Sequence, residues 1–237
     1  MAVIYGPVFY QLYQSRWETI DYTHAYFILP VSLWIAWQKR NILKDLFIRN
    51  KPQPSDMVGL AVAVFGLMMF VLGWRQGYLF ISSLSLIPVL WGSIRYLYGS
   101  AVVRSLAFPI FYLFFLIPPP LGVLDKLTLP MRYGISEATG NILHWLGYPI
   151  QRSGLLLTID GNDIFMGAPC SGFRSLITML ALAAGYVYSQ KGDPRKKLIL
   201  VFSGVPFALL GNLVRVMTLC LVTFYLGKEA AEGFFHY

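Results

Sequence analysis

Residues 167–176 have the sequence GAPCSGFRSL, in which a short polar turn carries one cysteine into a long apolar run. Pro169 disfavours helix for the residue before it, so the chain is expected to arrive extended. Ser171 and Gly172 are residue types that are common where helices begin, and the apolar run follows at once. These features predict that Cys170 lies at the N-terminus of a helix.

Two interpretations of Cys170 are open from the local sequence. Free backbone N–H groups and the positive end of the helix dipole lower the pKa of a thiol, and a thiolate at neutral pH is a nucleophile. An unpaired cysteine can equally be a small buried hydrophobe. Cys220 lies inside an apolar run and is predicted to serve packing, and two cysteines do not make a disulfide framework.

The composition indicates a membrane protein. The 237 residues are 57% hydrophobic and 13% charged, whereas a soluble domain is about a quarter charged. We therefore expect an all-α integral membrane protein, a polytopic helical bundle of about six to eight spans in one domain over residues 1–237. The net charge of +8 comes from Lys and Arg clustered in short loops. Such clusters are typical of membrane orientation and do not indicate nucleic-acid binding.

The apolar runs predict where the spans lie. Residues 1–13 form half of a span, which either lies at the interface or lacks an upstream part. The spans themselves are expected at residues 26–37, 57–74, 78–94, 105–117, 173–188 and 198–226. The last run is ~43 Å long as a helix, so it must tilt, project or break, with Gly211 and Gly227 as candidate break points. Basic loops such as 191–197 are expected to be cytoplasmic.

The outer side is predicted to carry the non-spanning elements. Three prolines at 118–120 end a helix, and the mixed residues 121–153 predict helices at the outer surface or dipping into it. Asp160-Gly161 between short β-favouring runs predicts a short β-hairpin. Because an extended hairpin cannot stand in lipid, it should lie at the outer surface and deliver the chain to Cys170.

Depth along the helices predicts that three polar residues converge. Cys170 precedes the basic loop 191–197 and Arg215 follows it by similar lengths, so both are expected ~30 Å above that loop on antiparallel neighbours. Arg215 is costly in hydrocarbon without a partner, and a thiolate would be one. Alternatively it is a snorkelling interfacial residue. His236 is also expected on the outer side, either in the site or as an ordinary interfacial histidine.

These residue types suit acyl transfer. A thiolate attacks a carbonyl to form a thioester, a histidine protonates the leaving amine, and an arginine stabilises the oxyanion or the thiolate. The reverse assignment of His236 and Arg215 stays open. Asn212 lies three residues before Arg215 and can orient it, or it can hydrogen-bond a neighbouring helix. His24 is a further supporting candidate, with a structural role as the alternative.

The ordered set of motifs resembles the exosortase/archaeosortase family, with the bacterial branch nearer. It consists of PCSGFRSL at 169–176, Asn212-x-x-Arg215 and His236, with a Trp17 to His24 stretch and residues 108–118 upstream. The resemblance implies a membrane cysteine protease or transpeptidase with a sortase-like Cys, His and Arg site on an unrelated fold. We expect no cofactor and no metal.

The resemblance also implies roles and partners. Cys170 would be the acyl-thioester nucleophile, and Arg215 and His236 the proton donor and oxyanion stabiliser in open order. The supporting residues would be Ser171, Gly172, Asn212 and His24. The substrate would be an exported protein with a C-terminal sorting signal of the PEP-CTERM type: a Pro-Glu-Pro-like motif, a transmembrane helix and a basic tail. The enzyme would sit in the bacterial inner membrane with its site facing the periplasm, and pass the protein to a glycan or lipid acceptor.

One departure and two alternatives complete the sequence-based expectations. The family continues past its histidine into another glycine-containing span, whereas this chain stops one residue after His236. Either the chain is cut at its C-terminal end, as we expect, or this histidine is not the family's. A transporter or channel would use Arg215 and Asn212 to line an anion pathway, although no internal repeat of hydropathy supports it. A metalloenzyme would use the three histidines, whose spacing matches no usual ligand pattern.

Overall fold

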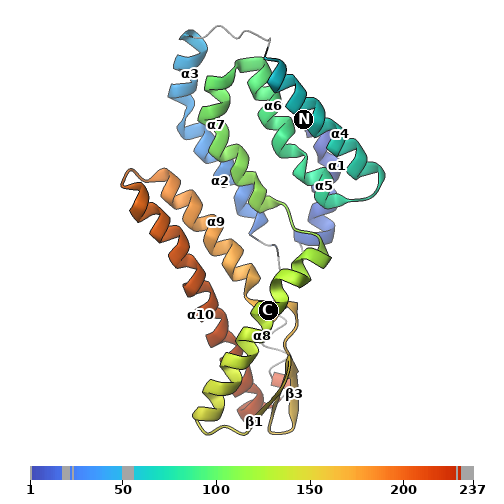
Figure 1. The fold of residues 1–237 in the computed structure, drawn as a ribbon, viewed down its shortest axis with the longest axis vertical. Helices are drawn as coiled ribbons and strands as arrows, with labels where there is room; N and C mark the ends of the chain where they lie inside the picture. The colour runs from blue at the N-terminus through green and yellow to red at the C-terminus, as the bar shows by residue number, and fades with distance from the viewer. Residues whose placement is uncertain (1, 18–21, 23, 50–55, 228, 231–237) are drawn as a thin grey trace. The chain divides into compact units, whose positions relative to one another are not determined.

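The computed structural model describes residues 2–17, 22, 24–49, 56–227 and 229–230 (Figure 1). The chain divides into two compact units, Met1–Pro119 and Pro120–Tyr237. Each unit has its own buried apolar clusters. The candidate nucleophile Cys170 belongs to the second unit.

The regular elements described in the first unit are all helical. They include a π-helical turn η1 (Tyr13–Trp17), which is wider than an α-helix, and a 3-10 turn η3 (Leu113–Leu116), which is tighter. The α-helices are α1 (Ala2–Leu12), α2 (Ala25–Gln38), α3 (Arg40–Arg49), α4 (Met57–Arg75), α5 (Leu79–Leu84), α6 (Leu86–Tyr98) and α7 (Ser100–Tyr112). The final turn η3 ends just before Pro118, as the three prolines predict.

Three helices of the described residues are long and apolar enough to cross a membrane: Met57–Arg75, Leu79–Tyr98, and Pro194–Leu226 of the second unit. Three shorter apolar helices, Ala25–Gln38, Ser100–Leu116 and Phe173–Ser189, coincide with the other expected spans. A mostly helical, multi-pass membrane protein is therefore confirmed. The expected six to eight spans are met only in part: three helices of the described residues are clear spans, and the other three are shorter apolar helices.

Helices α4 and α6 approach closely because glycines line their contact. Gly59, Gly66 and Gly73 recur every two turns of α4 and are its buried residues. A Cβ added at Gly66 would lie 2.8 Å from the backbone nitrogen of Val89, and one at Gly59 would lie 2.6 Å from that of Tyr96. Only glycine permits this separation, and small residues are the usual means by which membrane helices pack.

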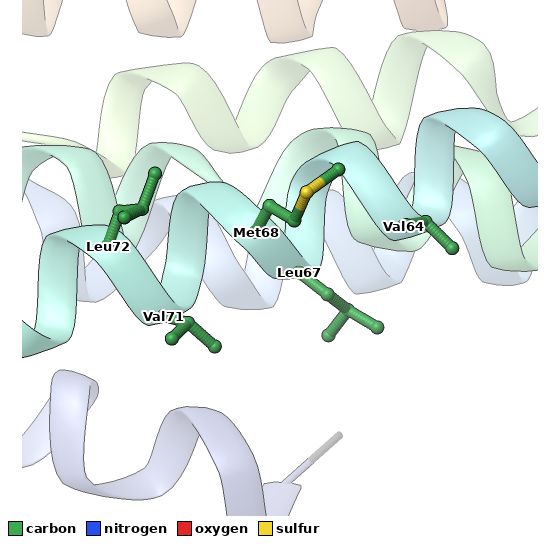
Figure 2. Close-up of a pocket in the computed structure, with 5 residues that line it drawn as sticks. All are labelled: Val64, Leu67, Met68, Val71 and Leu72. Carbon is green, nitrogen blue, oxygen red and sulfur yellow. The ribbon is translucent and has the colours of Figure 1, made fainter.

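The opposite side of α4 is an apolar surface. Val64, Leu67, Met68, Val71 and Leu72 line a shallow depression with no polar surface (Figure 2). Val64, Leu67, Met68, Val71 and Leu72 are each at least 40% exposed. Such a surface is expected of a helix whose outward face meets lipid chains.

The second unit combines helices with a small sheet. Its helices are α8 (Leu121–Trp145), α9 (Phe173–Ser189) and α10 (Pro194–Leu226), and a 3-10 turn η4 (Ala168–Ser171) precedes α9. The strands β1 (Ile150–Ser153), β2 (Leu156–Ile159) and β3 (Asn162–Phe165) form an antiparallel meander in that order. Figure 1 shows α9 and α10 side by side and antiparallel, as their short connection predicts.

The predicted hairpin is confirmed, with one strand more than expected. Asp160 and Gly161 have φ values of 47° and 76°. Positive φ at both central residues is the requirement of the two-residue turn that matches strand twist. The added strand, β1, pairs Arg152 with Leu157. Ile150 is the single buried residue of β1, and the sequence of this strand shows no alternation of apolar and polar residues. The sequence pattern therefore did not predict β1.

Two expectations for the helices of this unit are wrong in detail. Residues 121–153 were expected to form several surface helices, but α8 is one continuous helix through Pro130. The last run was expected to begin near residue 198 and to be able to break at Gly211. Instead α10 begins at Pro194, where the Asp193 side chain accepts a hydrogen bond from Arg195 N, and runs unbroken to Leu226 before Gly227.

Candidate active site

Cys170 lies in the turn before a helix, and not in the first turn of the helix itself. It occupies the 3-10 turn η4, and Gly172 then adopts the left-handed conformation with φ 74° and ψ 3° before α9 begins at Phe173. The buried Ser171 side chain accepts a hydrogen bond of 3.2 Å from Phe173 N. Ser171 therefore caps the start of α9, while the cysteine precedes that start.

Asn212 of α10 holds this turn in place. Its Nδ2 donates a 2.8 Å hydrogen bond to the carbonyl oxygen of Cys170, and the side chain is buried. Gly172 lies against the same residue, since a Cβ added there would be 2.8 Å from Asn212 Cβ. Asn212 was expected either to orient Arg215 or to hydrogen-bond a neighbouring helix. Its hydrogen bond goes to a neighbouring element, the turn η4.

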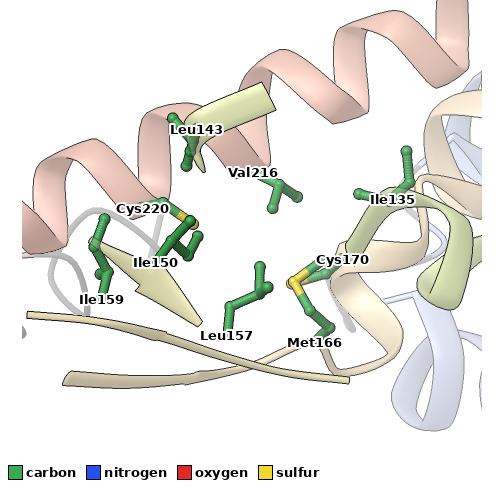
Figure 3. Packing of buried hydrophobic residues seen from close by; sticks show 9 residues of the cluster. All are labelled: Ile135, Leu143, Ile150, Leu157, Ile159, Met166, Cys170, Val216 and Cys220. Atoms are coloured by element: carbon green, nitrogen blue, oxygen red, sulfur yellow. The ribbon is translucent and has the colours of Figure 1, made fainter. Parts of the chain in front are cut away.

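The Cys170 side chain is enclosed mostly by apolar residues. It is 8% exposed and belongs to a buried cluster with Leu157, Met166, Val216 and other aliphatic residues. Figure 3 shows this cluster, with the Cys170 side chain near those of Leu157 and Met166. Burial is the largest influence and raises the pKa of the Cys170 thiol, while a hydrogen bond between the thiol and the backbone of Gly167 acts the other way. The expectation that a helix N-terminus lowers this pKa is wrong, because desolvation dominates.

Two arginines counter this effect of burial. The positive charges of Arg215 and Arg132 each lower the pKa of Cys170, and the influence of Arg215 is the larger. Arg215 lies on α10, three residues beyond Asn212, and the hydrogen bond of Asn212 brings that part of α10 to Cys170. The pKa of the Cys170 thiol is thus subject to two opposing effects: apolar burial raises it, and the charge of Arg215 lowers it.

Arg132 was not singled out by the sequence. It lies on α8, is 8% exposed, and forms an ion pair with Asp125. A usable signal existed: Thr128, Arg132 and Ser136 recur every four residues, which places three polar side chains on one face of a helix. The charged residues of this segment were taken together as an outer-surface feature, and so that periodicity was overlooked.

Of the remaining residues considered from the sequence, the structure describes His24 and Cys220. His24 belongs to the first unit, where it is buried and its ring lies 5.0 Å from that of Tyr22. His236 lies outside the described residues. Cys220 is fully buried in the cluster of Cys170, consistent with packing, and both cysteines are free thiols. Within the described ranges, no group of three or more His, Cys, Asp or Glu side chains is placed to hold a metal ion.

Comparison with known proteins identifies one family. A family model described as transmembrane exosortase (Exosortase_EpsH) matches residues 17–237, which is nearly the whole chain. No curated protein and no solved structure matches. The match includes the cysteine turn, the Asn212-x-x-Arg215 segment and His236.

Proposed function

Since the chain belongs to the transmembrane exosortase family, and thus to a group of membrane enzymes that process PEP-CTERM proteins, we propose that Cys170 is its nucleophile. The observation that carries the proposal is the action of Arg215 on Cys170. The guanidinium of Arg215 on α10 lowers the pKa of a thiol whose pKa burial raises, and the hydrogen bond of Asn212 brings that part of α10 to the Cys170 turn. A cation placed to favour the thiolate is what a cysteine nucleophile requires.

The proposed reaction is acyl transfer through a thioester. The Cys170 sulfur attacks the carbonyl carbon of the scissile peptide bond, and the carbonyl oxygen takes up the negative charge. Collapse of this intermediate breaks the C–N bond, and the amine leaves with a proton from an acid in the site. An acceptor hydroxyl or amine, or water, then attacks the thioester carbonyl and restores the sulfur.

We assign the charge-stabilising role to Arg215 and the proton-donor role to His236. A guanidinium keeps its proton at any physiological pH and so is a poor acid, but it is a permanent positive charge. An imidazole gains and loses a proton near neutral pH. Asn212 supports the site by donating a hydrogen bond to the Cys170 carbonyl oxygen. Ser171 and Gly172 set the conformation of the turn.

The proposed substrate is an exported protein with a PEP-CTERM-type C-terminal signal, cleaved near its motif and passed to a glycan or lipid acceptor. The proposed location is the bacterial inner membrane, with Cys170 on the periplasmic side. Support comes from the arrangement of α9 and α10. The loop between them carries Lys191, and the first turn of α10 carries Arg195, Lys196 and Lys197. These charges favour a cytoplasmic position for that end, and Cys170 lies near the other end of α9. His24 stays a predicted supporting residue.

The transporter alternative gains nothing from Asn212. Its buried amide is engaged with the Cys170 carbonyl, so it does not offer that donor to a permeating anion.

The test is co-expression with a reporter that ends in a PEP-CTERM-type signal. We expect cleavage by the wild type, no cleavage by Cys170→Ala, and retained cleavage by Cys220→Ala, which removes the other thiol from the same buried cluster. Mass spectrometry of trapped enzyme should find the reporter fragment on Cys170 as a thioester. Cleavage that persists in Cys170→Ala would overturn the mechanism.

A further inference from the structure

One face of α8 carries a row of buried polar side chains. Thr128, Arg132, Ser136 and Thr139 are each at most 8% exposed, although they lie on a helix of an apolar protein. Ser136 donates a hydrogen bond to Gly154 O. The row continues in Ile135 and Leu143, which belong to the cluster around Cys170 (Figure 3). This face of α8 is therefore packed into the buried cluster that contains Cys170.

Arg132 is held on this face by two hydrogen bonds. One of its terminal nitrogens donates to Asp125 Oδ1 at 2.9 Å and to Thr128 Oγ1 at 2.8 Å. Its Nε is buried and has no hydrogen-bond partner among the described residues. Buried polar groups are normally hydrogen-bonded, and each exception calls for an explanation.

The charge of Arg132 acts on Cys170. Helix α8 packs against η4, and the Arg132 guanidinium lowers the pKa of the Cys170 thiol, as Arg215 does from α10. Cys220 of α10, the other ionisable side chain of the buried cluster, is not among the groups that change the pKa of Cys170. The carboxylate that partners Arg132, Asp125, is itself largely exposed, so water screens much of its opposing charge.

We propose that Arg132 is a positioning residue of the thiol site: a second fixed cation, held by Asp125 and Thr128, that acts with Arg215 to stabilise negative charge on the Cys170 sulfur. The inference builds on the proposed nucleophile. Its test, however, measures ionisation of the thiol without any substrate.

The experiment follows the alkylation of Cys170 by iodoacetamide as a function of pH. It uses the full chain with Cys220→Ala, which leaves Cys170 as the one thiol in the sequence. We expect Arg132→Gln to move the midpoint of the rate upward by about 0.5 pH unit or more, so that alkylation below the midpoint slows about threefold. Arg132→Lys should restore most of the shift.

The matched control is Arg152→Gln. It removes the same charge from an exposed position on β1 of the same unit, and the midpoint should stay at its original value. An unchanged midpoint in a folded Arg132→Gln protein, or an equal shift in Arg152→Gln, would overturn the proposal. Should Arg132→Gln fail to fold, Thr128→Val decides, because it removes one of the two groups that hold Arg132. The midpoint should then rise, and an unchanged midpoint would overturn the proposal. If the midpoints shift as expected but the reporter is not cleaved, the role of Arg132 is supported and the proposed transpeptidase activity is contradicted.

Discussion

The side-chain amide of Asn212 is hydrogen-bonded to the carbonyl oxygen of Cys170 across 42 residues of sequence, at 2.8 Å. This contact joins α10 to the turn that carries the thiol. It also brings the helix that bears Arg215 to the sulfur whose pKa that arginine lowers. The position of the proposed nucleophile therefore depends on a residue that takes no part in the bond-making steps.

Removing the Asn212 amide should destabilise the turn. In Asn212→Ala the buried carbonyl of Cys170 loses its donor, so we expect a loss of about 1–3 kcal/mol of stability and reduced reporter cleavage. Chemical unfolding in detergent measures the first and reporter cleavage the second. Asn141→Ala, on the exposed face of α8, is the control and should change neither. Equal stability of the two variants would contradict the assigned role.

Gly172 should tolerate no side chain. Gly172→Ala places a Cβ 2.8 Å from Asn212 Cβ at a residue with φ 74°. Backbone strain alone is expected to cost about 1–2 kcal/mol, and the overlap adds to it. Gly154→Ala isolates the strain, because Gly154 has φ 64° and a Cβ there would meet its nearest atom at 3.9 Å. We expect a larger fall in unfolding temperature for Gly172→Ala, and the reverse order would count against this contact.

The close packing of α4 on α6 should depend on Gly66. Gly66→Ala would bring a methyl group within 2.8 Å of the Val89 backbone, so the helices must separate, at an expected cost of about 1–3 kcal/mol. Gly134→Ala on α8 has no atom within 4 Å of its added Cβ. There the same change should be neutral or stabilising, since alanine favours helix over glycine. Thermal unfolding of both variants checks the contrast.

Burial of Cys170 should make stability fall at alkaline pH. The folded pKa of this thiol is raised above its unfolded value by desolvation, so the folded state binds more protons than the unfolded state there. The contribution is fully present below the unfolded pKa of about 8.5 and is lost as pH rises toward the folded pKa. The unfolding temperature should thus fall more steeply above about pH 8.5 in the wild type than in Cys170→Ala. Parallel curves would show that the thiol is not desolvated.

The charge of Arg215 should set the reactivity of the thiol. Arg215→Gln removes the larger of the two influences that lower the pKa of Cys170, so alkylation near pH 8 should slow about threefold or more. Arg215→Lys should retain most of the rate. A rate unchanged in both variants would mean that the guanidinium does not act on the sulfur.

The local sequence predicted the elements that local forces shape. The Asp160-Gly161 turn, the helix end before Pro118 and the apolar helices follow from φ preferences, the missing proline N–H and hydrophobicity over short windows. Strand β1 was missed because a strand with one buried residue carries no alternation. The continuity of α8 was missed because tertiary packing overrides the low helix propensity of Pro130.

By itself, then, the sequence determined a multi-pass helical membrane protein with a thiol in a turn ahead of an apolar helix, because composition and short-range propensity are properties of contiguous residues. Only the tertiary structure decided what surrounds that thiol. The apolar enclosure by Leu157 and Met166, the amide of Asn212 and the charge of Arg132 reach Cys170 from different elements. Desolvation and Coulomb forces depend on distances in space, and spacing along the chain does not report them.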